Sequence, residues 1–509
     1  MNNVRRISRQ LIAYGTADVM ALAVNFLLLP IYTRVLSPHD YGALALLLVC
    51  EAFLKVIYRW GLDTSFLRFY YDCHTEEERQ TLASTIAGFW AAVDGTLLVV
   101  LLVAARPINR LLFDSVGFVT AYRLLVINTF GAAFLFLPLS LLRIQERARW
   151  FAALTFLRSA GTVVVRLTLV VGLGFGVTGL MLADVIITAL LLVILGRTLR
   201  SMLAWRFSRA VLRELLRYAL PRVPHGLLTQ TMGMADRFLL GLYMPLREVG
   251  LYLIANTVAA VIKFYPAAFE MAWMPFAFDS MRRPDARQLF ARMATYACLV
   301  LGFLALAIAG LSASIVELML PADYHAAGRI VPVLAVGMTI QSLAWFVATS
   351  LNIAKQTRAY PAIAAVGATA TIGANVLLIP RFGMLGAALA LVVSQTLATG
   401  TTLYFAQRAY AIPYEARRLL KLVGVGLGTY AAMVIMPAFD PWHTLSVRAG
   451  LLGLFPFWLF LIRFFQPHEM KQIREFLRSV IDRRRPSAVS DLKVSPTGSP
   501  GRPLSGPGL

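Results

Sequence analysis

The chain consists mainly of successive apolar stretches of roughly 20 residues, the length that crosses a bilayer as a helix, joined by short polar connections. Hydrophobic residues make up 59% of its 509 residues, more than a soluble core requires. An unpaired backbone group in lipid is costly, so apolar stretches that do not alternate with period two must be helices. We therefore predict an all-α polytopic membrane protein.

About fourteen transmembrane helices are predicted. The first follows Arg5, Arg6 and Arg9 but is too long for a signal peptide and has no small-residue cleavage pattern, so we expect it to be retained. The predicted spans cover residues 11–31, 40–61, 81–105, 118–141, 151–171, 175–196, 214–240, 248–270, 290–311, 328–351, 358–380, 383–408, 416–437 and 445–464.

The formal charge of +22 is spread over connections between spans, which favours a topological explanation and no nucleic-acid partner. The basic connections have one parity, shared with both termini, and the positive-inside rule places them in the cytoplasm of an inner-membrane protein. The loop at residues 63–80 is the exception. The basic clusters are at residues 143–149, 197–213, 282–287 and 417–421.

The last part of the chain differs in composition. A basic amphipathic segment follows residue 465, and a Ser/Pro/Gly-rich tail begins at Pro486. The segment suits an anionic membrane surface, and the tail is expected to be a disordered cytoplasmic extension. The three cysteines have no metal-ligand spacing, so neither a disulfide framework nor a metal site is predicted.

An internal repeat relates the second six spans to the first six at an offset of about 208 residues. Residues 37–42 correspond to 244–250, residues 146–150 to 356–360, and residues 175–180 to 382–387. Six spans per repeat make the two halves parallel, related by an axis along the membrane normal. We predict two six-helix bundles with a cavity between them, followed by two additional helices.

Three segments resemble the polysaccharide transporter family, which includes flippases for O-antigen and exopolysaccharide precursors. They are residues 29–42 (LPIYTRVLSPHDYG), residues 236–241 (DRFLLG) with 249–252 (VGLY), and residues 375–388 (NVLLIPRFGMLGAA). That family belongs to the multidrug/oligosaccharidyl-lipid/polysaccharide exporter superfamily. The resemblance implies two bundles in a V, alternating access, and transfer of undecaprenyl-diphosphate-linked sugars from the cytoplasmic to the periplasmic leaflet.

The predicted organisation has four parts. Residues 1–205 form the N-terminal six-helix bundle and residues 206–412 the C-terminal one. Residues 413–465 form two further spans, and residues 466–509 contain the basic segment and the tail.

Charged residues inside a span need a partner or a wet cavity, so they indicate where a function resides. Glu51, Lys55, Arg59 and Asp63 recur every four residues along one face of the second span. Their spacing permits two intrahelical ion pairs, which is the structural alternative. The repeat, however, places Lys55 over Lys263, and two such lysines can bind a diphosphate, with Arg59 as a bidentate donor.

Arg166 in the fifth span and Arg222 in the seventh are further candidates for the diphosphate or cavity site. Arg222 belongs to a stripe with His225 that two prolines interrupt. Packing is the alternative role for these residues. His225 can titrate near neutral pH, although a hydrogen-bonded interior histidine is the commoner outcome.

Candidates for energy coupling are Asp18 and Asn25 in the first span, then Asp94, Asp184 and Glu51, and also His225. A carboxylate in a dehydrated site can exchange protons or help to coordinate sodium, and the sequence does not choose between H⁺ and Na⁺. An interhelical hydrogen bond is the alternative role of Asp18.

These features predict a flippase for an undecaprenyl-diphosphate-linked oligosaccharide in cell-surface polysaccharide biosynthesis. Its expected partners are that glycan, membrane lipids and polysaccharide polymerase or assembly proteins. No nucleotide motif or nucleophile elbow occurs, so no enzyme activity, catalytic residue or cofactor is predicted. Two alternatives remain open, an ion-coupled multidrug antiporter of the same superfamily and a membrane glycosyltransferase or ligase.

Overall fold

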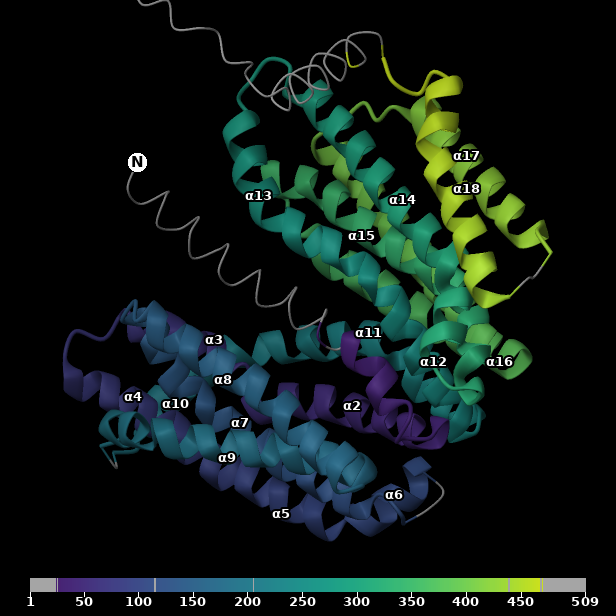
Figure 1. The fold of residues 1–509 in the computed structure, drawn as a ribbon. Coiled ribbons are helices and arrows are strands. Elements are labelled where there is room, and N and C mark those ends of the chain that lie inside the picture. The colour runs from purple at the N-terminus through teal and green to yellow at the C-terminus, as the bar shows by residue number, and fades with distance from the viewer. Residues whose placement is uncertain are drawn as a thin grey trace, which may run out of the picture.

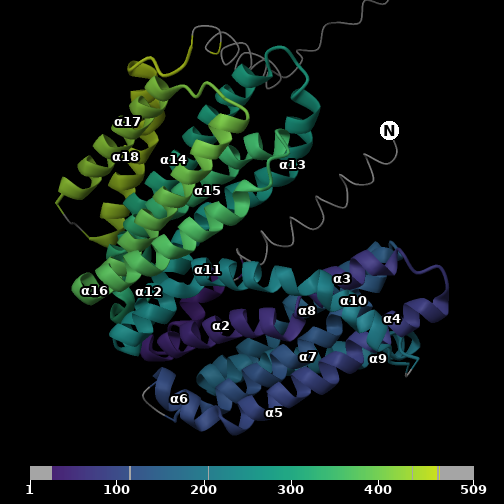
Figure 2. The same cartoon turned by 180° about the vertical axis from the view of Figure 1, so that it is seen from behind.

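The computed structural model describes residues 24, 26–113, 116–204, 206–437, 440–466 and 469, without the side chains of 268 and 270–272. Every regular element in the described part of the chain is a helix, which confirms the all-α prediction. The ribbons form two bundles that converge where α2, α12 and α16 meet and diverge away from that end (Figures 1 and 2). We call the converging end the apex.

The first bundle contains the purple and blue helices of Figure 1. Its elements are α2 (Pro38–Arg59), α3 (Leu62–Tyr70), α4 (Glu76–Phe89), the π-helix η1 (Trp90–Asp94), α5 (Gly95–Val103), α6 (Ala105–Phe113), α7 (Val119–Ile144), α8 (Ala148–Leu167), the π-helix η2 (Thr168–Gly172), α9 (Gly176–Met202) and α10 (Arg209–Ala219).

The second bundle and the two last helices run from teal to yellow. They are η3 (Leu220–Arg222), α11 (Val223–Tyr243), α12 (Leu246–Ala259), η4 (Ala260–Lys263), α13 (Phe264–Ser280), α14 (Ala286–Met319), η5 (Ala322–Arg329), α15 (Val331–Ile353), α16 (Ala359–Ala409), α17 (Ala416–Ile435) and α18 (Pro441–Leu461).

Eleven helical segments of the described chain are long and apolar enough to span a membrane, compared with the fourteen predicted. The first predicted span falls mostly outside the described residues. Helix α11, which carries Asp236 and Arg237, is not among the eleven. Helix α16 is one continuous 51-residue element where two spans were predicted, but its backbone leaves the helical region at Gly383 (φ 56°, ψ −131°).

The predicted span 214–240 is two separate helices. Helix α10 is amphipathic and packs its apolar side on the first bundle, with Leu215 and Ala219 fully buried against α3 and α4. The hydroxyl of Ser65 donates to the carbonyl of Leu215 at 3.3 Å. The short 3₁₀ helix η3, which contains Pro221, separates α10 from α11, because proline cannot supply the amide that a continuous helix needs.

At the apex, α2 and α12 pack backbone to backbone. A Cβ atom on Gly42 would lie 1.9 Å from the carbonyl oxygen of Leu246, and one on Gly250 would lie 1.9 Å from the carbonyl oxygen of Pro38. The contact is reciprocal, because Pro38 and Leu246 are each four residues before the glycine of their own helix. Only glycine permits this approach.

Two other positions repeat their backbone conformation between the halves. Gly176 and Gly383 have φ values of 55° and 56°, and Glu146 and Lys355 have φ values of 55° and 56°. Glu146 therefore corresponds to Lys355, one residue before the position that the sequence comparison gave. These shared left-handed turns show that the repeat extends to local backbone geometry.

Helix α11 connects the two bundles. Its Gly226 faces Val56 of α2 and its Gly241 faces Leu46 of the same helix, so α11 runs antiparallel to α2. Met232 of α11 reaches Gly367 of α16. A shift of α11 would therefore move α16 relative to α2.

Candidate charged site along α2, α8, α11 and α12

The predicted charged stripe of the second span is paired among its own residues. The Lys55 ammonium lies 2.6 Å from the Glu51 carboxylate, and the lysine side chain is 48% exposed. A nitrogen of Arg59, the last residue of α2, lies 3.5 Å from the carboxylate of Asp63, which belongs to α3. Both pairs that the i,i+4 spacing permits are thus formed, the second across the break between α2 and α3.

Arg166 on α8 is paired with Asp184 on α9. Its guanidinium nitrogen lies 2.7 Å and 2.8 Å from the two carboxylate oxygens, and both side chains are partly exposed. Glu51 and Arg158 lie within electrostatic range of Asp184. The structure therefore joins two predicted residues, Arg166 from the substrate set and Asp184 from the coupling set, in one ion pair.

Lys263 ends η4 and is exposed. It makes no hydrogen bond or ion pair with any residue that the structure describes. Asp236 and Arg237 of α11 lie within electrostatic range of its ammonium group. Of the two lysines matched by the repeat, Lys55 has a counter-ion, and Lys263 has none within the described part of the chain.

The neighbours of Lys263 on α11 are held by α12. The hydroxyl of Tyr252 donates to the buried Asp236 carboxylate at 2.7 Å. The Arg237 guanidinium donates to the side-chain oxygen of Asn256 at 2.6 Å. The sequence motif contained Asp236 and Arg237, but their partners are 16 and 19 residues away.

Arg222 and His225 lie at the start of α11, and both are exposed. The Arg222 guanidinium lies over the ring of Tyr218 with 5.5 Å to its centroid, a cation–π contact. The backbone carbonyl of His225 accepts from the Thr229 hydroxyl. No hydrogen bond or ion pair among the described residues joins Arg222 to Lys55 or Lys263.

Among the coupling candidates, Asp94 is completely buried at the end of η1. One of its oxygens accepts from the indole N–H of Trp60 at 2.9 Å, and the other has no hydrogen-bond partner among the residues that the structure describes. Asp18 and Asn25 lie outside the described residues.

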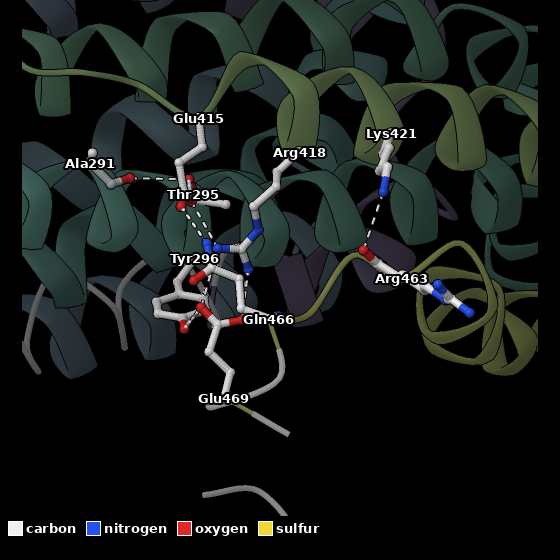
Figure 3. A network of polar contacts seen from close by, with 9 residues as sticks. All are labelled: Ala291, Thr295, Tyr296, Glu415, Arg418, Lys421, Arg463, Gln466 and Glu469. Carbon is white, nitrogen blue, oxygen red and sulfur yellow. Dashed lines mark hydrogen bonds and ion pairs between the residues drawn. The ribbon is translucent and has the colours of Figure 1, made fainter. Parts of the chain in front are cut away.

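A polar network that the sequence analysis missed centres on Arg418 of α17 (Figure 3). Its guanidinium lies 2.8 Å from Glu415 and 2.9 Å from Glu469, and it is 8% exposed. Tyr296 of α14 donates to Glu469 at 2.6 Å, and Lys421 donates to the carbonyl of Ile462 at 2.9 Å. The network joins α14, α17 and the segment after α18.

A surface cavity lies apart from all the predicted residues. It is formed between α3, α4, α7 and α9, and Tyr70, Arg79, Gln145 and Met202 line it. The described residues contain no cluster of three or more histidine, cysteine or acidic side chains suited to a metal ion.

Comparison with known proteins supports the resemblance. Residues 31–275 match the model of a family described as polysaccharide biosynthesis proteins. No curated protein matches the sequence significantly. The match confirms, for these residues, the resemblance predicted from the motifs.

Solved structures share the fold. Lipid II flippase MurJ in an inward closed conformation superposes with a TM-score of 0.65 at 13% identity, covering 89% of this chain and 99% of that one. An inward-facing multidrug resistance MATE family transporter of the MOP superfamily gives 0.59 at 16% identity, covering 80% and 96%. A variant of the Vibrio cholerae MATE transporter VcmN gives 0.54 at 14%, covering 80% and 98%.

Proposed function

We propose that this multi-pass membrane protein, which has the fold of MurJ and the MATE transporters, is a flippase for a polyprenyl-diphosphate-linked oligosaccharide. One observation carries the proposal. Lys55 and Lys263 each lie thirteen residues beyond the glycine through which their helix packs at the apex, Gly42 or Gly250.

Thirteen residues of α-helix span about 20 Å. The two lysines therefore lie at similar distances from the apex, one on each of the two helical arms that diverge from it. The first arm is α2, and the second is α12 continued by η4. The passage through η4 lengthens the second arm slightly, because a 3₁₀ helix rises more per residue. A diphosphate between the arms would meet one ammonium group from each bundle, and the sugars would occupy the space beside it.

Lys263 is the stronger anchor because no described side chain neutralises its charge. Lys55 shares its charge with Glu51 at 2.6 Å, so a diphosphate has to compete with that carboxylate. Arg59 is 42% exposed and lies 3.5 Å from Asp63, so it can make a bidentate contact if the diphosphate displaces that carboxylate. Arg166 contributes only if it is released from Asp184, and Arg222 at the start of α11 would attract the headgroup from outside.

The charge distribution supports an apex that faces the periplasm of an inner-membrane protein. Helices α2, α7 and α9 end together away from the apex, since Arg59 lies over the ring of Phe136 and Met202 packs in the cluster of Leu62 and Leu141. The basic connections begin at that end, and the positive-inside rule assigns it, with both termini, to the cytoplasm. Substrate would enter from the cytoplasmic side. It would leave after the two bundles close on that side and open on the periplasmic side.

An ion-coupled multidrug antiporter is the second candidate, since MATE transporters share the fold. A cationic drug would require an acidic site in the cavity, whereas the exposed charged group of the α2–α12 site that lacks a counter-ion among the described residues is Lys263. A glycosyltransferase or ligase acting on the same lipid would need a nucleophile or a metal site. We therefore propose transport without covalent chemistry, with polysaccharide polymerase or assembly proteins as partners.

Reconstitution tests the proposal. Purified protein is placed in vesicles that contain a fluorescent polyprenyl-diphosphate oligosaccharide, and a membrane-impermeant quencher reports its leaflet. Protein-dependent loss of the protected inner-leaflet pool is expected. A protected pool that stays constant, together with transport of a cationic dye, would instead identify the multidrug antiporter.

A further inference from the structure

Asp94 is a buried carboxylate, and only one of its two oxygens accepts a hydrogen bond from a described residue. It is 0% exposed, and its Oδ1 atom accepts a hydrogen bond from Trp60 at 2.9 Å. Its Oδ2 atom is buried, and no described residue makes a hydrogen bond to it. A carboxylate in this state is strongly destabilised when charged.

The atoms around this carboxyl group are also incompletely paired. Tyr58, which lies within electrostatic range of Asp94, and Trp90, four residues before it, are fully buried, and neither the hydroxyl nor the indole N–H has a partner. Aromatic rings enclose them, since Tyr58 contacts Phe130 and Trp90 contacts Phe134. The pocket is therefore apolar apart from these few polar atoms.

No cation among the described residues compensates Asp94. The helices packed on η1 are α2, α4 and α5, and α7 contacts Trp90 of η1 through Phe134. The charged residues of α7, Arg123 and Arg143, are exposed and lie near its two ends.

On α2, Lys55 and Arg59 are already paired with Glu51 and Asp63. The charged residues of α4 are in its first turn, at the far end from η1, and α5 has none. Asp94 makes no ion pair with a described residue, so a proton is the simplest way to neutralise it.

The geometry also favours a proton over a metal ion. Hard cations bind through several oxygen ligands. Around Oδ2 the structure shows no such set. A neutral carboxyl group needs only one acceptor for its proton while the other oxygen keeps the bond from Trp60.

The residue that holds Asp94 is itself the hinge of α2. Trp60 ends α2 with φ 50° and Gly61 follows with φ 69°, so two successive left-handed residues separate α2 from α3. A bulky residue in this conformation is strained and is maintained by its surroundings. The hydrogen bond to Asp94 is one contact that fixes the Trp60 side chain.

The hinge touches the connection between the bundles. A Cβ atom on Gly61 would lie 3.0 Å from the carbonyl oxygen of Ala219, the last residue of α10. Helix α10 leads through η3 into α11, which packs along α2 and α16. A change at the hinge would therefore move the element that joins the two halves.

We propose that Asp94 is the site at which proton binding and release are coupled to transport. Its protonation fixes the Trp60–Gly61 hinge in the conformation seen here. Loss of the proton leaves an anion that needs further hydrogen-bond donors. The Tyr58 hydroxyl and the Trp90 indole make no bond to it here, so these groups or water can reach Oδ2 only after the hinge opens. The proton bound in this conformation is thus released in the other. The inference rests on the proposed function only in that the coupled process is taken to be glycolipid transport.

Distances between the bundles test the inference without any substrate. Spin labels are placed at Trp150 of α8 and Leu420 of α17, both exposed, after Cys50, Cys73 and Cys298 are replaced by serine. The distance distribution is measured in nanodiscs between pH 5 and 9. We expect a pH-dependent shift in the wild type that is the same in sodium and potassium buffers.

Asp94→Asn mimics the protonated group and should retain the low-pH distribution at every pH. Trp60→Phe removes the donor and should reduce the pH-dependent shift. Asp72→Asn, at an exposed aspartate paired with Arg68, is the matched control and should shift as the wild type does. If Asp94→Asn does not fold, an unchanged shift in Trp60→Phe still overturns the proposal.

A wild-type pH shift in Asp94→Asn, or dependence on sodium, would also overturn it. An Asp94-dependent shift in a protein that moves no glycolipid would contradict the proposed function alone, because these distances are measured without substrate.

Discussion

Gly42 of α2 and Gly250 of α12 make reciprocal close contacts with each other's helix. A Cβ atom on Gly42 would lie 1.9 Å from the carbonyl oxygen of Leu246, and one on Gly250 would lie 1.9 Å from that of Pro38. This reciprocal contact agrees with the internal repeat predicted from the sequence. Lys55 and Lys263 each lie thirteen residues beyond one of the two glycines.

Substitution of either glycine by alanine is predicted to disrupt the apex. The added methyl group meets backbone atoms, so Gly42→Ala or Gly250→Ala should lower the free energy of unfolding by about 1–3 kcal/mol, the usual effect of overpacking. Gly400→Ala is the control, because nothing lies within 4 Å of its Cβ position in α16. Monomer retained after heating in detergent is the measurement. Equal losses in the three variants would contradict the reciprocal packing.

Tyr252→Phe is predicted to destabilise the second bundle. The change leaves one oxygen of the buried Asp236 without its donor, which is expected to cost about 1–3 kcal/mol. Tyr404→Phe, at an exposed tyrosine, should have little effect. Thermal unfolding of the two purified variants compares them, and equal stability would show that the Tyr252 bond is unimportant.

Variants of the Arg166–Asp184 ion pair can distinguish a substrate-binding role of Arg166 from a structural one. If Arg166 binds substrate, Asp184→Asn releases its guanidinium and preserves transport, whereas Arg166→Gln reduces it. The exchange Arg166→Asp with Asp184→Arg should restore stability but not transport. Vesicle transport and thermal stability are measured together. Full transport by the exchanged pair would assign Arg166 a structural role.

The stabilisation contributed by the Arg418–Glu469 network of Figure 3 is predicted to persist in mild acid. Burial alone would raise the pKa of Glu469, but hydrogen bonds from Tyr296 and the Gln466 amide, with the Arg418 guanidinium, lower it below the ordinary value of 4.5. A lowered pKa means that the stabilisation is complete above 4.5 and is lost as the pH falls through the lowered value.

The test compares the wild type with Glu469→Gln by thermal unfolding at a series of pH values. Their difference should persist from pH 8 to 5 and shrink only in stronger acid. A difference that vanishes near pH 6 would indicate a raised pKa and contradict the network.

Much of the fold was predictable because membrane helices have a strong sequence signal. Apolar length identified most of the spans, and the motif around Gly42 and Gly250 revealed the repeat. The i,i+4 spacing also predicted the pairs of Lys55 with Glu51 and of Arg59 with Asp63. These are local properties, which sequence order determines directly.

Contacts between distant helices were not predictable. Asp94 meets Trp60 across 34 residues because a π-helix and a left-handed hinge aim the two side chains at each other. Arg418 meets Glu469 across 51 residues. The predicted span 214–240 begins inside α10, but the charged face of α10 and Pro221 make it a separate helix on the first bundle. Each depends on tertiary packing that periodicity does not encode.

Binding of the diphosphate of a lipid-linked glycan by Lys55 and Lys263 underlies the proposed function. Its most direct measurement is the leaflet assay on the double variant Lys55→Gln/Lys263→Gln, with Lys355→Gln as the control at an exposed lysine. Each lost charge-assisted contact is worth about 1.5–3 kcal/mol, or roughly 10- to 100-fold in affinity. We predict that the double variant folds but does not move the glycolipid, and that arginine at both positions restores movement. Undiminished movement by the double variant would contradict the claim.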